Sequence, residues 1–151
     1  MKVKIQNLKD MQISGVKYCL KEECEPYRET YFDWTAYPMV TDMGTQNLVA
    51  GFLRAWHHEP RFTQVETHDG MELFYFPEGS CIMLFCDVKD GKVFMESAQM
   101  ARIDAGTELC IEPGKAHFVP VGITDSFTAV VVSPKQEAPR IDLPEEIVGE
   151  F

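Results

Sequence analysis

The chain is divided into short β-favouring runs by glycine and proline turns, and this pattern restricts it to an all-β fold. Asp90-Gly91 between two such runs is a strong hairpin signal. Pro113-Gly114 marks a further turn, and no long window repeats apolar residues at the helical spacing. The predicted strands of the middle region are residues 47–56, 62–68, 72–77, 80–88, 93–98, 107–111, 116–121 and 126–133. Short strands at intervals of roughly 8 to 12 residues predict a sandwich or a small barrel.

The chain length of 151 residues fits a single domain, so we expect one domain over residues 1–151. Residues 47–133 are predicted to form the barrel core. Residues 1–46 carry a loop and two further predicted strands, at 2–8 and 14–21. We expect this N-terminal region to make the contact of a homodimer.

The C-terminal residues 134–151 are rich in proline and acidic side chains. We expect this segment to run over the surface. Its apolar residues Ile141, Leu143 and Ile147 would then dock on the barrel or on a partner subunit.

Charge and cysteine usage exclude several classes of protein. The formal net charge of -10 argues against a nucleic-acid or anionic-membrane partner, because both need a basic face. No run approaches the roughly 18 apolar residues of a membrane span, and the N-terminus lacks the apolar core of a signal peptide. We therefore expect a cytoplasmic protein that acts on a small molecule. The 5 cysteines, an odd number without a Cys-x-x-Cys pair, argue against a disulfide scaffold or a thiolate zinc site.

Two histidines and two glutamates stand beside glycine turns in a pattern that could hold a metal. Glu66 and His68 are two residues apart, so on a regular strand they point to the same face. Glu72 follows the turn expected at Asp69-Gly70, and a hairpin there would bring it close to His68. His117 follows the Gly114 turn, which could feed a strand into the same cavity. Two imidazoles with carboxylates suit one divalent ion, Zn, Mn, Fe or Ni. The alternative is that the histidines are separate surface or hydrogen-bonded residues.

The spacing of these residues resembles the cupin family. The usual first cupin motif is glycine, five residues, His-x-His, three or four residues, Glu, six residues and glycine. Glu66, His68, Glu72 and Gly79 follow this spacing, with Glu66 in place of the first histidine and Pro60 in place of the opening glycine.

The second cupin motif is glycine, five residues, Pro-x-Gly, two residues and histidine. Gly106, Gly114 and His117 follow it, with Glu112 in place of the proline. The resemblance implies a cupin double-stranded β-helix, a jelly-roll barrel, with Glu66, His68, Glu72 and His117 as the metal ligands.

A longer resemblance points to the ureidoglycolate lyase branch of the cupins, whose members cleave ureidoglycolate to glyoxylate and urea and are usually homodimers. The segments that carry it are Arg54-Ala55, Glu66-Thr67-His68, Tyr75-Phe76-Pro77, Ala101-Arg102-Ile103 and Gly114-Lys115-Ala116-His117. This resemblance implies a lyase that breaks a carbon–nitrogen bond in a ureido or hydroxy acid.

Substrate contacts are predicted at Arg54, His57 and Lys115. The forked guanidinium of Arg54 could clamp a substrate carboxylate, or form a surface salt bridge. His57 follows Arg54 at a strand end, and Lys115 is close to His117 in sequence.

Three functions remain open from the sequence. The leading hypothesis is a metal-dependent enzyme of the ureidoglycolate lyase type, in which Glu66 or Glu72 is the catalytic base. The second is a cupin isomerase or epimerase of a sugar or sugar acid. The third is a non-catalytic cupin that binds a metabolite or a metal.

Overall fold

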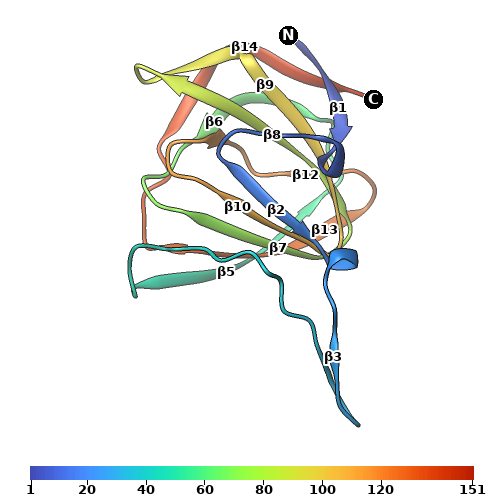
Figure 1. Ribbon diagram of the computed structural model, residues 1–151. Coiled ribbons are helices and arrows are strands. Elements are labelled where there is room, and N and C mark those ends of the chain that lie inside the picture. The colour runs from blue at the N-terminus through green and yellow to red at the C-terminus, as the bar shows by residue number, and fades with distance from the viewer.

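The computed structural model describes residues 1–151 as a β-barrel from which one hairpin arm projects (Figure 1). Two short 3-10 helices, η1 (Leu8–Asp10) and η2 (Lys21–Glu23), lie near the N-terminus. The strands are β1 (Lys2–Asn7), β2 (Val16–Leu20), β3 (Tyr27–Arg28), β4 (Asp33–Trp34), β5 (Leu48–Trp56), β6 (Arg61–Glu66), β7 (Glu72–Glu78), β8 (Ser80–Lys89), β9 (Lys92–Asp104), β10 (Thr107–Ile111), β11 (Ala116–His117), β12 (Val121–Gly122), β13 (Ser126–Pro134) and β14 (Arg140–Glu150). Neither helix is long and apolar enough to cross a membrane.

Two sheets form the walls of the barrel. The first has the order β11-β6-β14-β1-β9-β8-β12, and β11 also pairs with β8. The second has the order β2-β10-β7-β13-β5. Most pairs are antiparallel, but β1 runs parallel to both β14 and β9. The arm is a separate pair of strands, β3 and β4, and we define it as residues 25–37.

The core lies inside the barrel because each strand turns alternate side chains inward. On β10, Leu109 and Ile111 join a cluster of 14 buried residues between the sheets. Phe76 and Phe127 lie in the same cluster, with their ring centroids 6.2 Å apart. A second cluster of 9 buried residues lies on the other side of the seven-stranded sheet and includes Ile147.

The structure confirms the all-β barrel and most of the predicted strands. The hairpin at Asp90-Gly91 joins β8 to β9 with Lys89 opposite Lys92. Asp90 has φ 50° and Gly91 has φ 72°, so both central residues are left-handed, as a two-residue type I′ turn requires.

The C-terminal segment differs from its prediction as a surface segment. Residues Arg140–Glu150 form β14, which pairs with β6 on one side and β1 on the other. The register with β6 shifts between Asp142 and Ile147, and Pro144 lies within this irregular stretch. Ile147 is fully buried, so this segment is a wall of the barrel.

The predicted strand 116–121 also differs, because it is two short strands, β11 and β12, with a break between them. This break brings β11 between β6 and β8.

Candidate metal centre

The four predicted metal ligands come from three neighbouring elements at one end of the barrel. Glu66 ends β6 and His117 ends β11, and the two residues are direct partners in the antiparallel pairing of these strands. His68 follows β6, and Glu72 begins β7 after the Asp69-Gly70 turn. The register between β6 and β11 therefore joins motifs that are about fifty residues apart in the sequence.

The ligand atoms of these residues converge. One oxygen of Glu72, Oε2, lies 2.9 Å from His117 Nε2 and 3.4 Å from His68 Nε2. Glu66 Oε1 lies 4.0 Å from His68 Nε2. Glu66, His68 and His117 each offer one ligand atom within 4.8 Å of the others. His117 is 1% exposed and His68 is 9% exposed, so water is largely kept from both rings.

Backbone carbonyls fix the tautomer of both histidines. His68 Nδ1 lies 3.1 Å from the carbonyl oxygen of Glu137, and His117 Nδ1 lies 3.1 Å from that of Lys115. A carbonyl oxygen only accepts hydrogen bonds, so each Nδ1 carries the hydrogen. In a neutral imidazole of His68 the lone pair is then on Nε2, which has no hydrogen-bond partner. His117 Nε2 is hydrogen-bonded to Glu72 Oε2 at 2.9 Å, so a proton lies between these two atoms, at the position that a metal ion would take. Metal-binding histidines are oriented in this way by outer hydrogen bonds.

This arrangement needs a positive group at its centre. His68 Nε2 is buried, and its contact with Glu72 lacks hydrogen-bond geometry, so the nitrogen has no hydrogen-bond partner. A buried polar atom without a partner is destabilising. Two nitrogen lone pairs and a carboxylate oxygen repel one another unless a proton or a metal ion lies between them. The donor set fits a divalent ion such as Zn(II), Mn(II), Fe(II) or Ni(II).

The centre opens into a small cavity of about 120 Å³ inside the barrel. Phe74 lines it and packs edge-on against His117, with the ring centroids 6.4 Å apart. Most of the remaining wall is apolar. The residues of the lining are Leu53, Glu66, Glu72, Phe74, Met83, His117, Phe118, Val119, Pro120 and Val131. Reacting groups in this cavity would be shielded from water.

Two of the three predicted substrate contacts are exposed and do not line this cavity. Leu53 faces the cavity from β5, so its neighbour Arg54 points to the opposite, exposed face of the strand. His57 is exposed, and its Nδ1 lies 2.8 Å from the carbonyl oxygen of Ile123.

The third predicted contact, Lys115, is buried, and its ammonium donates to Asp87 Oδ1 at 2.7 Å. Its backbone carbonyl, not its charge, reaches the centre through His117. A substrate role for Arg54, His57 and Lys115 stays a prediction.

Sequence reasoning missed the carbonyls that orient the histidines. The carbonyl of Glu137 comes from the loop between β13 and β14, and a backbone acceptor has no signature in residue types. It also gave no indication of the contact between Phe74 and His117.

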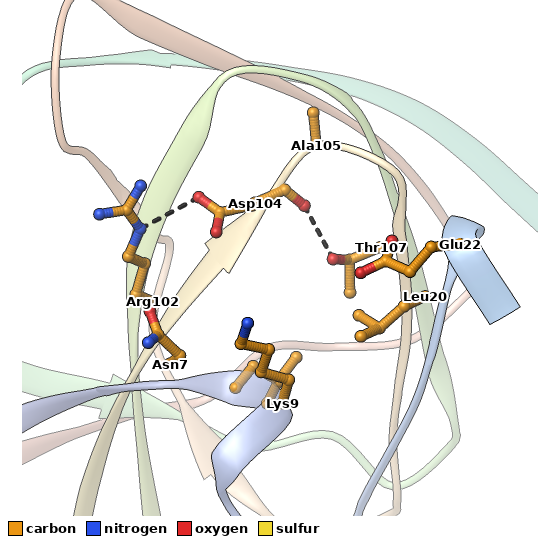
Figure 2. A pocket seen from close by; sticks show the side chains of 9 residues that line it. Asn7, Lys9, Leu20, Glu22, Arg102, Asp104, Ala105 and Thr107 are labelled. Carbon is orange, nitrogen blue, oxygen red and sulfur yellow. Dashed lines mark hydrogen bonds and ion pairs between the residues drawn. The ribbon is translucent and has the colours of Figure 1, made fainter.

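A second hollow, of about 240 Å³, lies at the other end of β9 (Figure 2). Glu22 and Asp104 are its two acids. Asp104 is already satisfied, because its Oδ1 accepts hydrogen bonds from Arg102 Nε at 3.0 Å and from Ser80 Oγ at 2.6 Å. Thr107 Oγ1 donates to the Asp104 carbonyl at 2.7 Å. No histidine lines this hollow, so it lacks the ligand set of the metal centre.

Comparison with known proteins identifies the fold. No family model and no curated protein matches the sequence. Several solved structures are similar. RmlC from Streptococcus suis, in complex with dTDP-D-xylose, has a TM-score of 0.54 and 11% identity over 80% of this chain and 64% of that chain. A dTDP sugar isomerase from Desulfovibrio desulfuricans G20 has a TM-score of 0.52 and 15% identity over 87% of this chain and 85% of that chain. The dTDP-6-deoxy-D-glucose-3,5-epimerase RmlC from Legionella pneumophila Philadelphia 1, in complex with dTDP-4-keto-L-rhamnose, has a TM-score of 0.52 and 13% identity over 91% of this chain and 74% of that chain.

These similarities confirm the predicted all-β cupin jelly roll. At such low identities they carry the fold alone. This chain also spans less than two thirds of the Streptococcus suis protein. The solved structures named here are of sugar epimerases and isomerases, and these comparisons do not show the ureidoglycolate lyase family.

Proposed function

We propose that this protein is a metal-dependent cupin enzyme that isomerises or epimerises a small sugar or sugar acid. The observation that carries the proposal is the convergence of two histidine Nε2 atoms on one oxygen of Glu72 beside a small, mostly apolar cavity. The enzymes of similar fold favour this chemistry over the cleavage of ureidoglycolate.

The metal would be held by His68, His117 and Glu72, with Glu66 at the edge of the set. When bound, a divalent ion supplies a Lewis acid that polarises a carbonyl or hydroxyl oxygen. The unpartnered Nε2 of His68 is the atom that most needs such an ion.

The two carboxylates have different surroundings, and we assign them different roles. Glu72 Oε2 is in contact with both imidazoles. The carboxylate of Glu66 has no hydrogen bond from any group of the chain, and it lines the cavity. Glu66 is therefore free to take a proton from the substrate carbon next to a carbonyl. Returning that proton to the neighbouring carbonyl carbon, while the hydroxyl proton moves to the former carbonyl oxygen, gives isomerisation. Delivery of a proton to the opposite face of the original carbon gives epimerisation.

The size of the cavity limits the substrate. Pockets for drug-sized ligands measure about 300–1,000 Å³, and this cavity measures about 120 Å³. A unit of a few carbon atoms enters it, whereas a nucleotide does not. We therefore propose a small keto sugar or sugar acid, with its reacting carbons beside Glu66.

The test is solvent exchange. The metal-loaded protein is incubated in D₂O with a panel of small keto sugars and sugar acids, with ureidoglycolate included as the competing substrate. Deuterium at the carbon next to the carbonyl, followed by NMR, is the expected result. Glu66→Gln should lose the exchange and keep the metal, whereas Glu72→Gln should lose both. Exchange that survives Glu66→Gln would contradict the assignment of the base. Metal-dependent stabilisation without turnover of any compound would favour a binding protein.

A further inference from the structure

A larger cavity, of about 540 Å³, lies on the outer face of the five-stranded sheet, under the arm. It is separate from the metal centre because Phe74 and Tyr75 are adjacent on β7 and point to opposite faces. Phe74 lines the metal cavity, and Tyr75 lines this one. The lining residues are Lys21, Asp33, Trp34, Thr35, Ala36, Tyr37, Tyr75 and Glu108.

Aromatic rings form much of its wall. Tyr37 stands edge-on to Tyr75, with the ring centroids 5.5 Å apart. The Tyr37 hydroxyl donates to the Gly106 carbonyl at 2.7 Å, which ties the arm to the sheet. Trp34 lies at the same cavity and is 64% exposed, so a ligand could cover its indole. The faces of aromatic rings carry partial negative charge and attract cations.

A carboxylate without a partner lies beside these rings. Glu108 is on β10, between Cys19 of β2 and Tyr75 of β7 in the pairing of the sheet. Its Oε2 is buried and has no hydrogen-bond partner. Burial raises the pKa of this carboxyl above its usual value. A buried acceptor left without a donor is costly. Because Glu108 lines the cavity, a positive charge there would lie beside its carboxylate.

The charges around the cavity sum to a net negative value. Asp33 and Glu108 contribute two acids, and Lys21 contributes one base. No carboxylate lies within 4.0 Å of the Lys21 ammonium, so the two acids are not neutralised by it through an ion pair.

We propose that this cavity is a binding site for an organic ammonium ion, held by the rings of Trp34, Tyr37 and Tyr75 and by the carboxylate of Glu108. This proposal is independent of the metal centre and of the reaction there. Rings against the carbon surface and a carboxylate against the charge form a site for a substituted amine.

The experiment measures binding of choline and of ethanolamine to the full chain, at constant ionic strength. The neutral analogue 3,3-dimethylbutan-1-ol has the shape of choline without its charge. Trp34 and Trp56 are the 2 tryptophans of the chain, so a Trp56→Phe background leaves Trp34 as the fluorescent probe. Titration calorimetry on the unmodified chain gives an independent dissociation constant.

We expect saturable binding of choline or ethanolamine that changes Trp34 fluorescence, and no saturation with the neutral analogue. Glu108→Gln should weaken binding by about tenfold. Lys21→Met should tighten it, because it removes the opposing charge. Glu96→Gln on β9, outside this cavity, is the matched control and should leave binding unchanged. His117→Ala should also leave it unchanged.

The proposal is overturned if neither amine saturates, or if the neutral analogue binds as tightly as choline. It is also overturned if Glu108→Gln keeps the dissociation constant, or if Lys21→Met weakens binding. Folding of each variant is checked by circular dichroism. Should Glu108→Gln fail to fold, Lys21→Met and Trp34→Ala provide the same test from the opposite side of the cavity.

Discussion

Loading the proposed metal centre should raise the thermal stability of this protein by a calculable amount. A ligand that binds only the native state at 100 times its dissociation constant adds about 2.7 kcal/mol to the free energy of unfolding. For a chain of 151 residues, each kcal/mol shifts Tm by about 2–4 °C. The expected rise is therefore about 5–11 °C. Its structural origin is the unpartnered Nε2 of His68 and the close approach of His117 Nε2 to Glu72.

The assay compares each protein with itself. The protein is stripped with a chelator, and Tm is measured by calorimetry before and after addition of Zn(II), Mn(II), Fe(II) or Ni(II). His68→Ala and His117→Ala should lose most of the rise. Because His117 is buried, its variant will also melt lower without metal, so only the shift on loading is compared. His57→Ala, which changes an exposed histidine outside the cavity, is the control and should keep the full rise. An equal rise in His68→Ala, or no rise in the parent with any of the four metals, would refute the reasoning.

Three further predictions concern turns and charges. Gly79 and Gly91 both have positive φ, but an added Cβ at Gly79 would lie 2.7 Å from Phe127 Cα, whereas one at Gly91 would meet nothing within 4 Å. Gly91→Ala should therefore lower the free energy of unfolding by about 1–2 kcal/mol in urea melts, and Gly79→Ala should lower it by clearly more. Equal losses in the two variants would contradict this. Burial raises the pKa of Glu108, so the native state binds its proton more tightly than the unfolded state does. Glu108→Gln should therefore have a higher free energy of unfolding than the parent at neutral pH, and the difference should vanish as pH falls below the ordinary carboxyl pKa near 4.5. Urea melts of both proteins between pH 3 and 7 measure this, and a difference that stays constant over that range would contradict the prediction. The side-chain oxygen of Gln136 accepts a hydrogen bond from the backbone amide of Gly70 at 2.8 Å, in the turn between His68 and Glu72. Gln136→Ala should therefore weaken metal binding about tenfold without removing a ligand. An unchanged dissociation constant for the metal would show that the turn keeps its conformation without Gln136.

The strands of the barrel could be predicted because their signals are local. β10 shows why, since Thr107, Leu109 and Ile111 face inward and are bounded by the Gly106 and Pro113-Gly114 turns. The alternation of inward and outward side chains and the turn residues both depend on a few neighbouring positions in the sequence, so each strand can be predicted locally.

The outward direction of the Arg54 side chain could not be predicted from neighbouring residues. Both faces of β5 carry apolar residues, with Leu53 inside and Phe52 and Trp56 outside. Alternation therefore gives no clear inner face, and the predicted substrate contact of Arg54 rested on its forked guanidinium and on the resemblance carried by Arg54-Ala55. The register with β13 decides the matter, because it places Leu53 opposite Ala129 of the buried cluster, and this pairing joins distant parts of the chain.

The grouping of the predicted ligands could be expected from the sequence for a different reason. His68 and His117 lie far apart in sequence, but His68 stands two residues before Gly70 and His117 three residues after Gly114. The pairing of Glu66 with His117 then brings the two segments together. The C-terminal segment had no such signal, because Pro144 and its acidic neighbours resemble a surface tail. The irregular stretch between Asp142 and Ile147 accommodates the proline inside a paired strand.

This segment also joins the fold to the site. The Glu137 carbonyl that orients His68 lies in the connection between β13 and β14. The same connection carries Gln136, which binds the turn at Gly70 between two ligands. A tail lying loosely on the surface could not hold an imidazole in one tautomer, whereas a strand paired on both sides can. The pairing of β14 with β6 and β1 therefore helps to position the candidate metal centre, although β14 itself carries none of the predicted ligands.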